Sequence, residues 1–119
     1  MGYLALGNNT IGIFNTAIGS NALVGNTTGA NNTGVGSGAL VSNMAGDSNT
    51  AIGTAGLGEN FSANNNTASG YQALNQNSSG NNNTATGYQT LFWICFASVA
   101  VSITLVARST ERRAAVLSP

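Results

Sequence analysis

A five-residue motif recurs in this chain at a constant interval, without insertion or deletion between copies. The first copy is Asn-Thr-Ala-Ile-Gly, and every later copy keeps the Asn, the Thr and the final Gly. A repeat of fixed length is typical of solenoids, in which each repeat forms one coil and contacts only its neighbours. Residues seventeen positions apart are therefore predicted to lie over one another. The copies occupy residues 15–19, 32–36, 49–53, 66–70 and 83–87.

One column of the repeat contains only leucine. A residue that stays apolar in every repeat, between neighbours that vary, is expected to face inward, so this column predicts the core. The alternative is an exposed apolar stripe that binds a partner. The core ladder predicted in this way consists of Leu6, Leu23, Leu40, Leu57, Leu74 and Leu91.

Asparagine and threonine fill adjacent columns, and a further Asn column runs from Asn9 to Asn77. Stacked side-chain amides can hydrogen-bond to the amides above and below them. Asn also tolerates left-handed backbone, and Gly supplies positive φ without a steric penalty. We therefore expect short strands near residues 16–19 and corners at the Asn-x-x-Gly stretches, such as 26–29. The predicted Asn and Thr ladders are Asn15, Thr16, Asn32, Thr33, Asn49, Thr50, Asn66, Thr67, Asn83 and Thr84.

Other parts of the repeat leave alternatives open. Residues 20–24 and 71–75 fit either a second strand or a single helical turn. One column contains only small side chains, which indicates close approach of another wall of the solenoid or of another chain. The adjacent column changes from aliphatic to polar residues in the later repeats, as expected of a partly hydrated or intersubunit face. The small column is Ala17, Gly34, Ala51, Ala68 and Ala85, and its neighbour is Ile18, Val35, Ile52, Ser69 and Thr86.

The composition excludes most kinds of catalytic site. The 119 residues include three Lys+Arg, three Asp+Glu, one Cys and no His. An imidazole base, a His-ligated metal and a catalytic triad all require His, and one Cys cannot form an internal disulfide. Residues 1–107 contain neither Lys nor Arg, so a basic nucleic-acid-binding face is excluded. We therefore expect no enzyme, cofactor, metal site or nucleic-acid partner, and no ligand-binding residue is identified.

The repeat resembles that of a known family. Asn-Thr-Ala-Ile-Gly at 15–19 and Gly-Tyr-Gln-Ala-Leu at 70–74 are similar to the head repeats of YadA-like trimeric autotransporter adhesins and to repeats of bacteriophage tail fibres. The resemblance implies a left-handed parallel β-roll, a homotrimer, and attachment of a cell-surface or virion fibre to an unidentified host-surface or matrix ligand. The repeat is longer than the commonest head repeat of those adhesins, and neither a heptad stalk nor a β-barrel anchor is evident.

The repeat ends after Leu91, and residues 88–107 carry no charge. A helix of about twenty residues reaches about 30 Å, the thickness of a hydrocarbon core. Arginines follow at 108, 112 and 113, as on a cytoplasmic flank. One interpretation is a membrane-spanning helix over Leu91–Ala107. The alternatives are a buried capping strand or hairpin, or a foreign tail left by truncation or a frameshift.

These observations define the expected architecture. The chain is predicted to be all-β, with a parallel solenoid of five to six coils over residues 1–91, an apolar segment over 92–107 and a polar tail over 108–119. The expected function is that of a structural and adhesive surface-fibre segment. The alternatives are an ice- or crystal-surface binder that uses the Thr column, and a non-functional fragment of a longer fibre protein.

Overall fold

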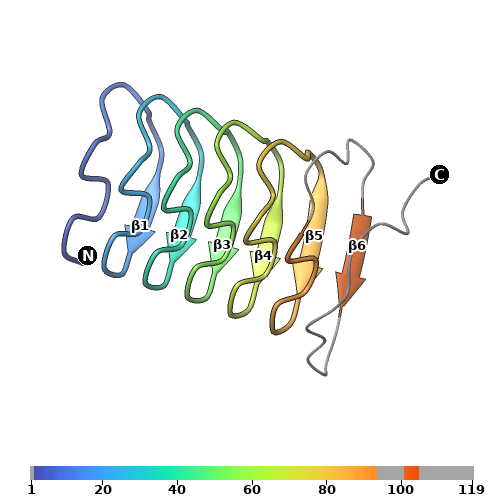
Figure 1. Ribbon diagram of the computed structural model, residues 1–119. Helices are drawn as coiled ribbons and strands as arrows, with labels where there is room; N and C mark the ends of the chain where they lie inside the picture. The colour runs from blue at the N-terminus through green and yellow to red at the C-terminus, as the bar shows by residue number, and fades with distance from the viewer. Residues whose placement is uncertain (1, 94–100, 105–119) are drawn as a thin grey trace.

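The computed structural model describes residues 2–93 and the backbone of residues 101–104. The chain winds into successive coils of similar outline, each of which contributes one short strand to the same side (Figure 1). The strands form one parallel sheet in sequence order, so the predicted parallel β-solenoid is confirmed. The strands are β1 Thr16–Ile18, β2 Thr33–Val35, β3 Thr50–Ile52, β4 Thr67–Ser69, β5 Asn83–Thr86 and β6 Val101–Thr104.

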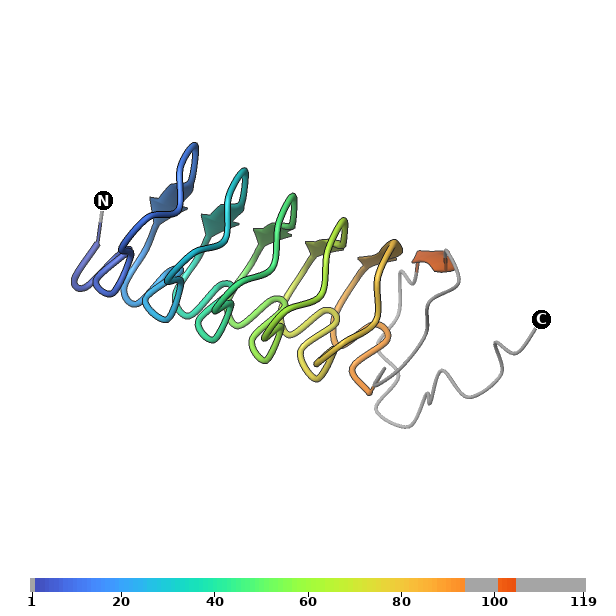
Figure 2. The same cartoon turned by 90° about the horizontal axis from the view of Figure 1, so that it is seen from above.

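The register of the first five strands follows the sequence repeat. Thr16 pairs with Thr33 and Thr33 pairs with Thr50, so each step along the sheet is one whole repeat. Successive side chains of a strand point to opposite faces of the sheet. The central Ala of β1 is accordingly buried, whereas Thr16 and Ile18 on either side of it are exposed. Seen from above, the strands lie on one side of the stack and the turns on the other (Figure 2).

The segments left ambiguous by the sequence, residues 20–24 and 71–75, are runs of turns rather than a strand or a helix. Their backbone N–H groups donate alternately to a carbonyl of the same coil and to a carbonyl of a neighbouring coil. The N–H of Ala22 donates to Gly19 within the coil at 3.3 Å, and the N–H of Leu23 donates to Ala39 of the next coil at 2.9 Å. Coils are therefore hydrogen-bonded to each other through the turns as well as through the sheet.

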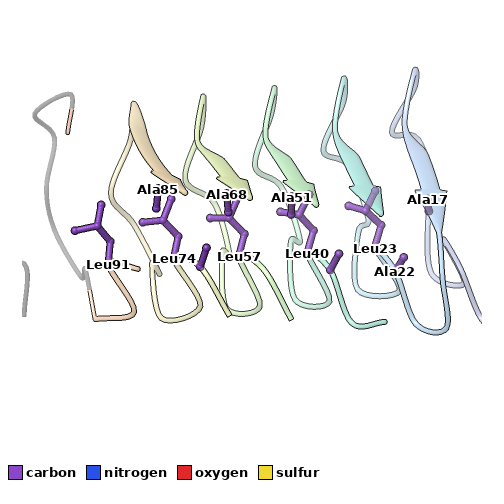
Figure 3. Close-up of a cluster of buried hydrophobic side chains, with 12 residues drawn as sticks. Ala17, Ala22, Leu23, Leu40, Ala51, Leu57, Ala68, Leu74, Ala85 and Leu91 are labelled. Carbon is purple, nitrogen blue, oxygen red and sulfur yellow. The ribbon is translucent and has the colours of Figure 1, made fainter. Parts of the chain in front are cut away.

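The leucine column lies inside the solenoid, as predicted, between the turns and the sheet (Figure 3). Its side chains contact small residues of the strand wall. A Cβ added at Gly34 would lie 3.4 Å from Leu23 Cγ and 3.2 Å from the Ala39 carbonyl oxygen. The small column thus faces the opposite wall of the same coil. Leu6 is only partly buried, and the fully buried leucines are Leu23, Leu40, Leu57, Leu74 and Leu91.

The sixth strand corrects one prediction and confirms part of its alternative. Val101–Thr104 is a strand paired with β5, so the helix expected over Leu91–Ala107 is wrong at these four residues, and residues 91–93 are not helical either. Val, Ile and Thr favour a strand, and the free edge of β5 offers backbone partners. Of the alternative, a strand is confirmed at these four residues. Residues 94–100, 105–107 and the tail at 108–119 lie outside the described part.

The pairing of β6 also departs from the repeat. Thr84 pairs with Ser102, so this step is one position longer than the steps between the earlier strands. This register aligns Ser-Ile-Thr of β6 with Thr-Ala-Thr of β5 and so preserves the polar–apolar–polar order, which a slip by one position would invert. Among residues 2–93 and 101–104, no helix is long and apolar enough to cross a membrane.

Candidate functional site

Two columns of buried asparagines run along the inside of the stack. In the first column, each side-chain amide donates to the amide of the preceding coil: Asn43 Nδ2 lies 2.8 Å from Asn26 Oδ1, and Asn60 Nδ2 lies 2.7 Å from Asn43 Oδ1. The same Nδ2 atoms also donate within their own coil, as from Asn43 to the Gly46 carbonyl at 2.9 Å. The amide ladder inferred from the sequence therefore exists. Its members are Asn9, Asn26, Asn43, Asn60 and Asn77.

The second Asn column bonds to backbone rather than to its own amides. Asn32 Oδ1 accepts from the backbone N–H of Asn49 at 2.9 Å, and Asn32 Nδ2 donates to the Gly46 carbonyl at 2.7 Å. Each of these amides thus joins its own coil to the next one. The sequence predicted amide-to-amide contacts within this column, whereas its side chains bridge backbone groups. Asn49 Nδ2 and Asn66 Nδ2 also donate to the first column, to Asn43 Oδ1 and Asn60 Oδ1, at 3.3 Å each. The column is Asn15, Asn32, Asn49, Asn66 and Asn83.

A third ladder, on the exposed edge, was not predicted. Asp47 Oδ1 accepts from the Ala30 N–H at 2.7 Å, and Asn64 Oδ1 accepts from the Asp47 N–H at 2.7 Å. Asn81 continues the series with Asn64 at 2.6 Å. The signal in the sequence was weak, because this column holds Ile13 and Ala30 in the earlier coils. Asp47 is therefore part of a structural ladder.

The corner geometry differs from the expectation. Gly29, at the end of an Asn-x-x-Gly stretch, does not have positive φ; a Cβ there would instead collide with the Gly46 carbonyl oxygen. Close approach of the next coil thus explains this glycine. The left-handed residues include the buried leucines of the core column, with φ between 49 and 54°. The left-handed conformation costs a residue other than glycine about 1–2 kcal/mol, so the packing of the coils must impose it here.

The outer face of the sheet carries two parallel ranks of side chains. One rank is the predicted Thr column, whose hydroxyls form no hydrogen bond with another described residue, so it is a register column rather than a bonded ladder. The other rank begins with Ile18, Val35 and Ile52 and continues with Ser69 and Thr86. Ile18 and Ile52 are each 50% exposed. We call these two ranks the outer strand face; the Thr rank is Thr16, Thr33, Thr50, Thr67 and Thr84.

A short aromatic stack lies on another surface of the last coils. The rings of Tyr71 and Tyr88 are stacked at 5.2 Å between centroids, and both remain more than two-fifths exposed. The neighbouring Gln89 donates its Nε2 to Gln72 Oε1 at 2.8 Å. This pair is local, because the same column holds Ser20, Ser37 and Thr54 in the preceding coils.

The described residues contain no group of three or more His, Cys, Asp or Glu side chains arranged to hold a metal ion. Asp47 and Glu59 are exposed, and all three arginines lie beyond the described residues. The repeats therefore present two exposed carboxylates and no cationic side chain among the described residues, and otherwise hydroxyl, amide and aliphatic groups in fixed rows. No protein-family model, curated protein or solved structure matches the chain.

Proposed function

We propose that this chain is a structural and adhesive segment of a cell-surface or virion fibre. The observation that supports the proposal is the continuity of bonding between coils. Neighbouring coils are joined through the sheet, through the turns and through the Asn columns, all in one register. A stack bonded on every side resists bending, and it repeats one surface at regular intervals along its length. Both properties suit a fibre that holds a binding surface away from its anchor.

Three copies would associate through the outer strand face. This face carries the exposed Ile18 and Ile52 and the half-buried Val35, without a charged neighbour in the strands. Burying aliphatic side chains stabilises an association by about 25 cal/mol per Å² of apolar area. The resemblance of the repeat to trimeric adhesin heads supports the number three.

Mass photometry of the purified chain tests the assembly. The expected result is a trimer that dissociates in the double variant Ile18→Asn/Ile52→Asn. The matched control is Ile11→Asn/Ile13→Asn, which changes two isoleucines that are at least as exposed but lie outside the strands. A chain that stays monomeric at all concentrations would overturn the trimer.

Attachment is tested separately with the labelled chain on immobilised matrix proteins and a glycan array. Saturable binding to a member of either panel supports the adhesive role. Equal retention on every surface, including albumin, contradicts it, as does absence of binding on both panels.

A second candidate function is binding to ice or another crystal surface. The observation in its favour is the Thr rank, which stands in register on the outer strand face with hydroxyls free of partners among the described residues. Parallel strands repeat at about 4.7–4.9 Å, which gives these hydroxyls a lattice-like spacing. Thermal hysteresis that is lost in Thr33→Lys/Thr50→Lys would support this function. Ice growth unaffected by the wild-type chain would dispose of it.

A further inference from the structure

The motif Asn-x-Ser/Thr, which accepts N-linked sugars, occurs several times in the repeats, and the structure separates its copies into two kinds. An Asn that carries a sugar must lie on the surface, because the attached sugar is bulky and hydrated. Burial and hydrogen bonding therefore decide which copies can act as acceptors. The Asn residues of these acceptor motifs are Asn8, Asn26, Asn31, Asn60, Asn65, Asn77 and Asn82.

In the first kind of acceptor motif, the amide is buried and bonded inside the stack. Asn26 Nδ2 donates both of its hydrogens, to Asn9 Oδ1 at 2.7 Å and to the Gly29 carbonyl at 2.9 Å. Asn60 and Asn77 repeat this arrangement in later coils, and all three residues are 0% exposed. A sugar on Nδ2 would replace one of the bonded hydrogens and would have no room, so these copies are not acceptors in the folded chain.

In the second kind, the amide lies on an exposed corner two residues before a strand begins. Asn31 and Asn65 are exposed, and their side chains make no hydrogen bond with another described residue. The hydroxyls of Thr33 and Thr67, two positions later, are also free of partners within the described part. Both groups that define the acceptor motif are therefore available to an enzyme. Asn82 is exposed at the same position of the last repeat.

The backbone conformation at this corner does not by itself require Asn. Asn31 and Asn65 have φ of 60 and 59°, in the left-handed region that Asn tolerates. However, Phe14 and Ser48 occupy the same column, each with φ of 59°. The column thus accepts other side chains, and neither conformation nor bonding inside the stack accounts for the two amides.

We propose that Asn31 and Asn65 are N-glycosylation sites of the folded chain, with a nucleotide-activated sugar as the donor. The Asn Nδ2 forms a bond to the anomeric carbon of the sugar while the bond from that carbon to the diphosphate oxygen breaks. The nucleoside diphosphate leaves with the electron pair, and one amide proton passes to a base of the transferase. Asn8 is also exposed, but its motif is less available, because the Thr10 hydroxyl donates to the Thr27 carbonyl at 2.8 Å.

The two sites lie two coils apart, about 9–10 Å at the spacing of parallel strands. Their sugars would therefore follow one edge of the solenoid in the direction of the stack. This inference goes beyond the proposed fibre function, since it uses neither the contact between copies nor the host ligand.

The test is incubation of the folded chain with a soluble asparagine glucosyltransferase and UDP-glucose, followed by mass spectrometry of the intact chain. The variant Thr33→Val/Thr67→Val removes both acceptor motifs without changing either Asn, and it should take up two hexoses fewer than the wild type. The matched control Thr28→Val/Ser62→Ala changes two exposed residues and removes the motifs of two buried amides. It should take up as many hexoses as the wild type.

A synthetic peptide of residues 24–36 contains one acceptor motif of each kind outside the fold, and it should take up two hexoses. Circular dichroism checks that both double variants keep the wild-type fold. Equal uptake by the wild type and Thr33→Val/Thr67→Val, or a loss of hexoses in the control, would overturn the proposal. Either result would leave the trimer and the attachment role unaffected, because mass photometry and the binding panels measure those separately.

Discussion

Asn32 joins three coils, because its side-chain Oδ1 accepts from the backbone N–H of Asn49 one coil ahead and its backbone N–H donates to Asn15 Oδ1 one coil behind. The same bridge recurs at Asn49 and Asn66, which are fully buried. Removing a buried amide that bonds to the backbone of a neighbouring coil leaves that backbone group without a partner, so the effect extends beyond the substituted residue. The free energy of unfolding should therefore depend strongly on where along the column an Asn is removed.

Asn49→Ala is expected to lower the free energy of unfolding by about 2–3 kcal/mol, because the buried N–H of Asn66 loses its acceptor. Asn83→Ala is the matched control. Its side chain has no partner among the described residues, so the substitution should leave the stability unchanged or raise it. Urea denaturation of both variants measures the difference. Equal destabilisation would contradict the bridging role.

Leu40→Ala should destabilise the solenoid by about 2–5 kcal/mol, the usual range for truncation of a buried leucine. Leu40 is fully buried and has φ of 54°. Leu4 has φ of 58° but is 50% exposed, so Leu4→Ala changes the same residue type in the same backbone conformation without opening a core cavity. The control should lower stability by less than about 1 kcal/mol. Thermal or urea unfolding of the two variants distinguishes core packing from backbone conformation.

Gly53→Ala is expected to be among the most damaging single substitutions, at more than about 3 kcal/mol. Gly53 has φ of +128°, and an added Cβ would lie 2.5 Å from the Gly70 carbonyl oxygen of the next coil. Gly38 provides the comparison, with φ of +67° and open space around the Cβ position. Ala55 occupies the same column with φ of 57°, so Gly38→Ala should change stability by less than about 1 kcal/mol. Circular dichroism and urea titration of each variant supply the test.

Asp47→Asn should be neutral within about 0.5 kcal/mol, because an amide oxygen can accept the Ala30 N–H as the carboxylate does. Asn64 already performs this role one coil later. Asp47→Ala removes the acceptor and should lower stability by about 1 kcal/mol. A large loss in Asp47→Asn would mean that the negative charge itself matters, contrary to the structural role assigned to this residue.

The period of the sequence predicted the stacking because the repeat never changes its length, so one correct register determines all the others. The inward leucine column followed from the same argument. Its left-handed backbone could not be predicted, because Leu intrinsically disfavours that conformation and only the bonding of Leu23 N–H to the next coil reveals why it is adopted. Local conformational preference also gave the wrong explanation for Gly29, which is required because a neighbouring coil approaches its Cα closely.

The end of the array was the least predictable part. Hydropathy alone favoured a helix after Leu91, whereas residues 101–104 continue the sheet. The free edge of β5 decided this outcome, and an edge exists only once the preceding coils have formed. The outer Asp47–Asn64–Asn81 ladder was missed for a related reason, since its pattern covers only three coils.

The uniform register has a consequence for how such a rod changes its length. Adding or deleting one whole repeat moves Asn43 onto the place of a neighbour with the same donors and acceptors, so both interior columns remain continuous. An insertion of another length inside the segment that forms the rows shifts leucine against asparagine and interrupts the rows at that junction. The length of the rod can therefore change only by whole repeats, and each repeat adds one strand spacing of about 4.7–4.9 Å. Duplication of a repeat in the gene would lengthen the rod while every contact between coils stays the same.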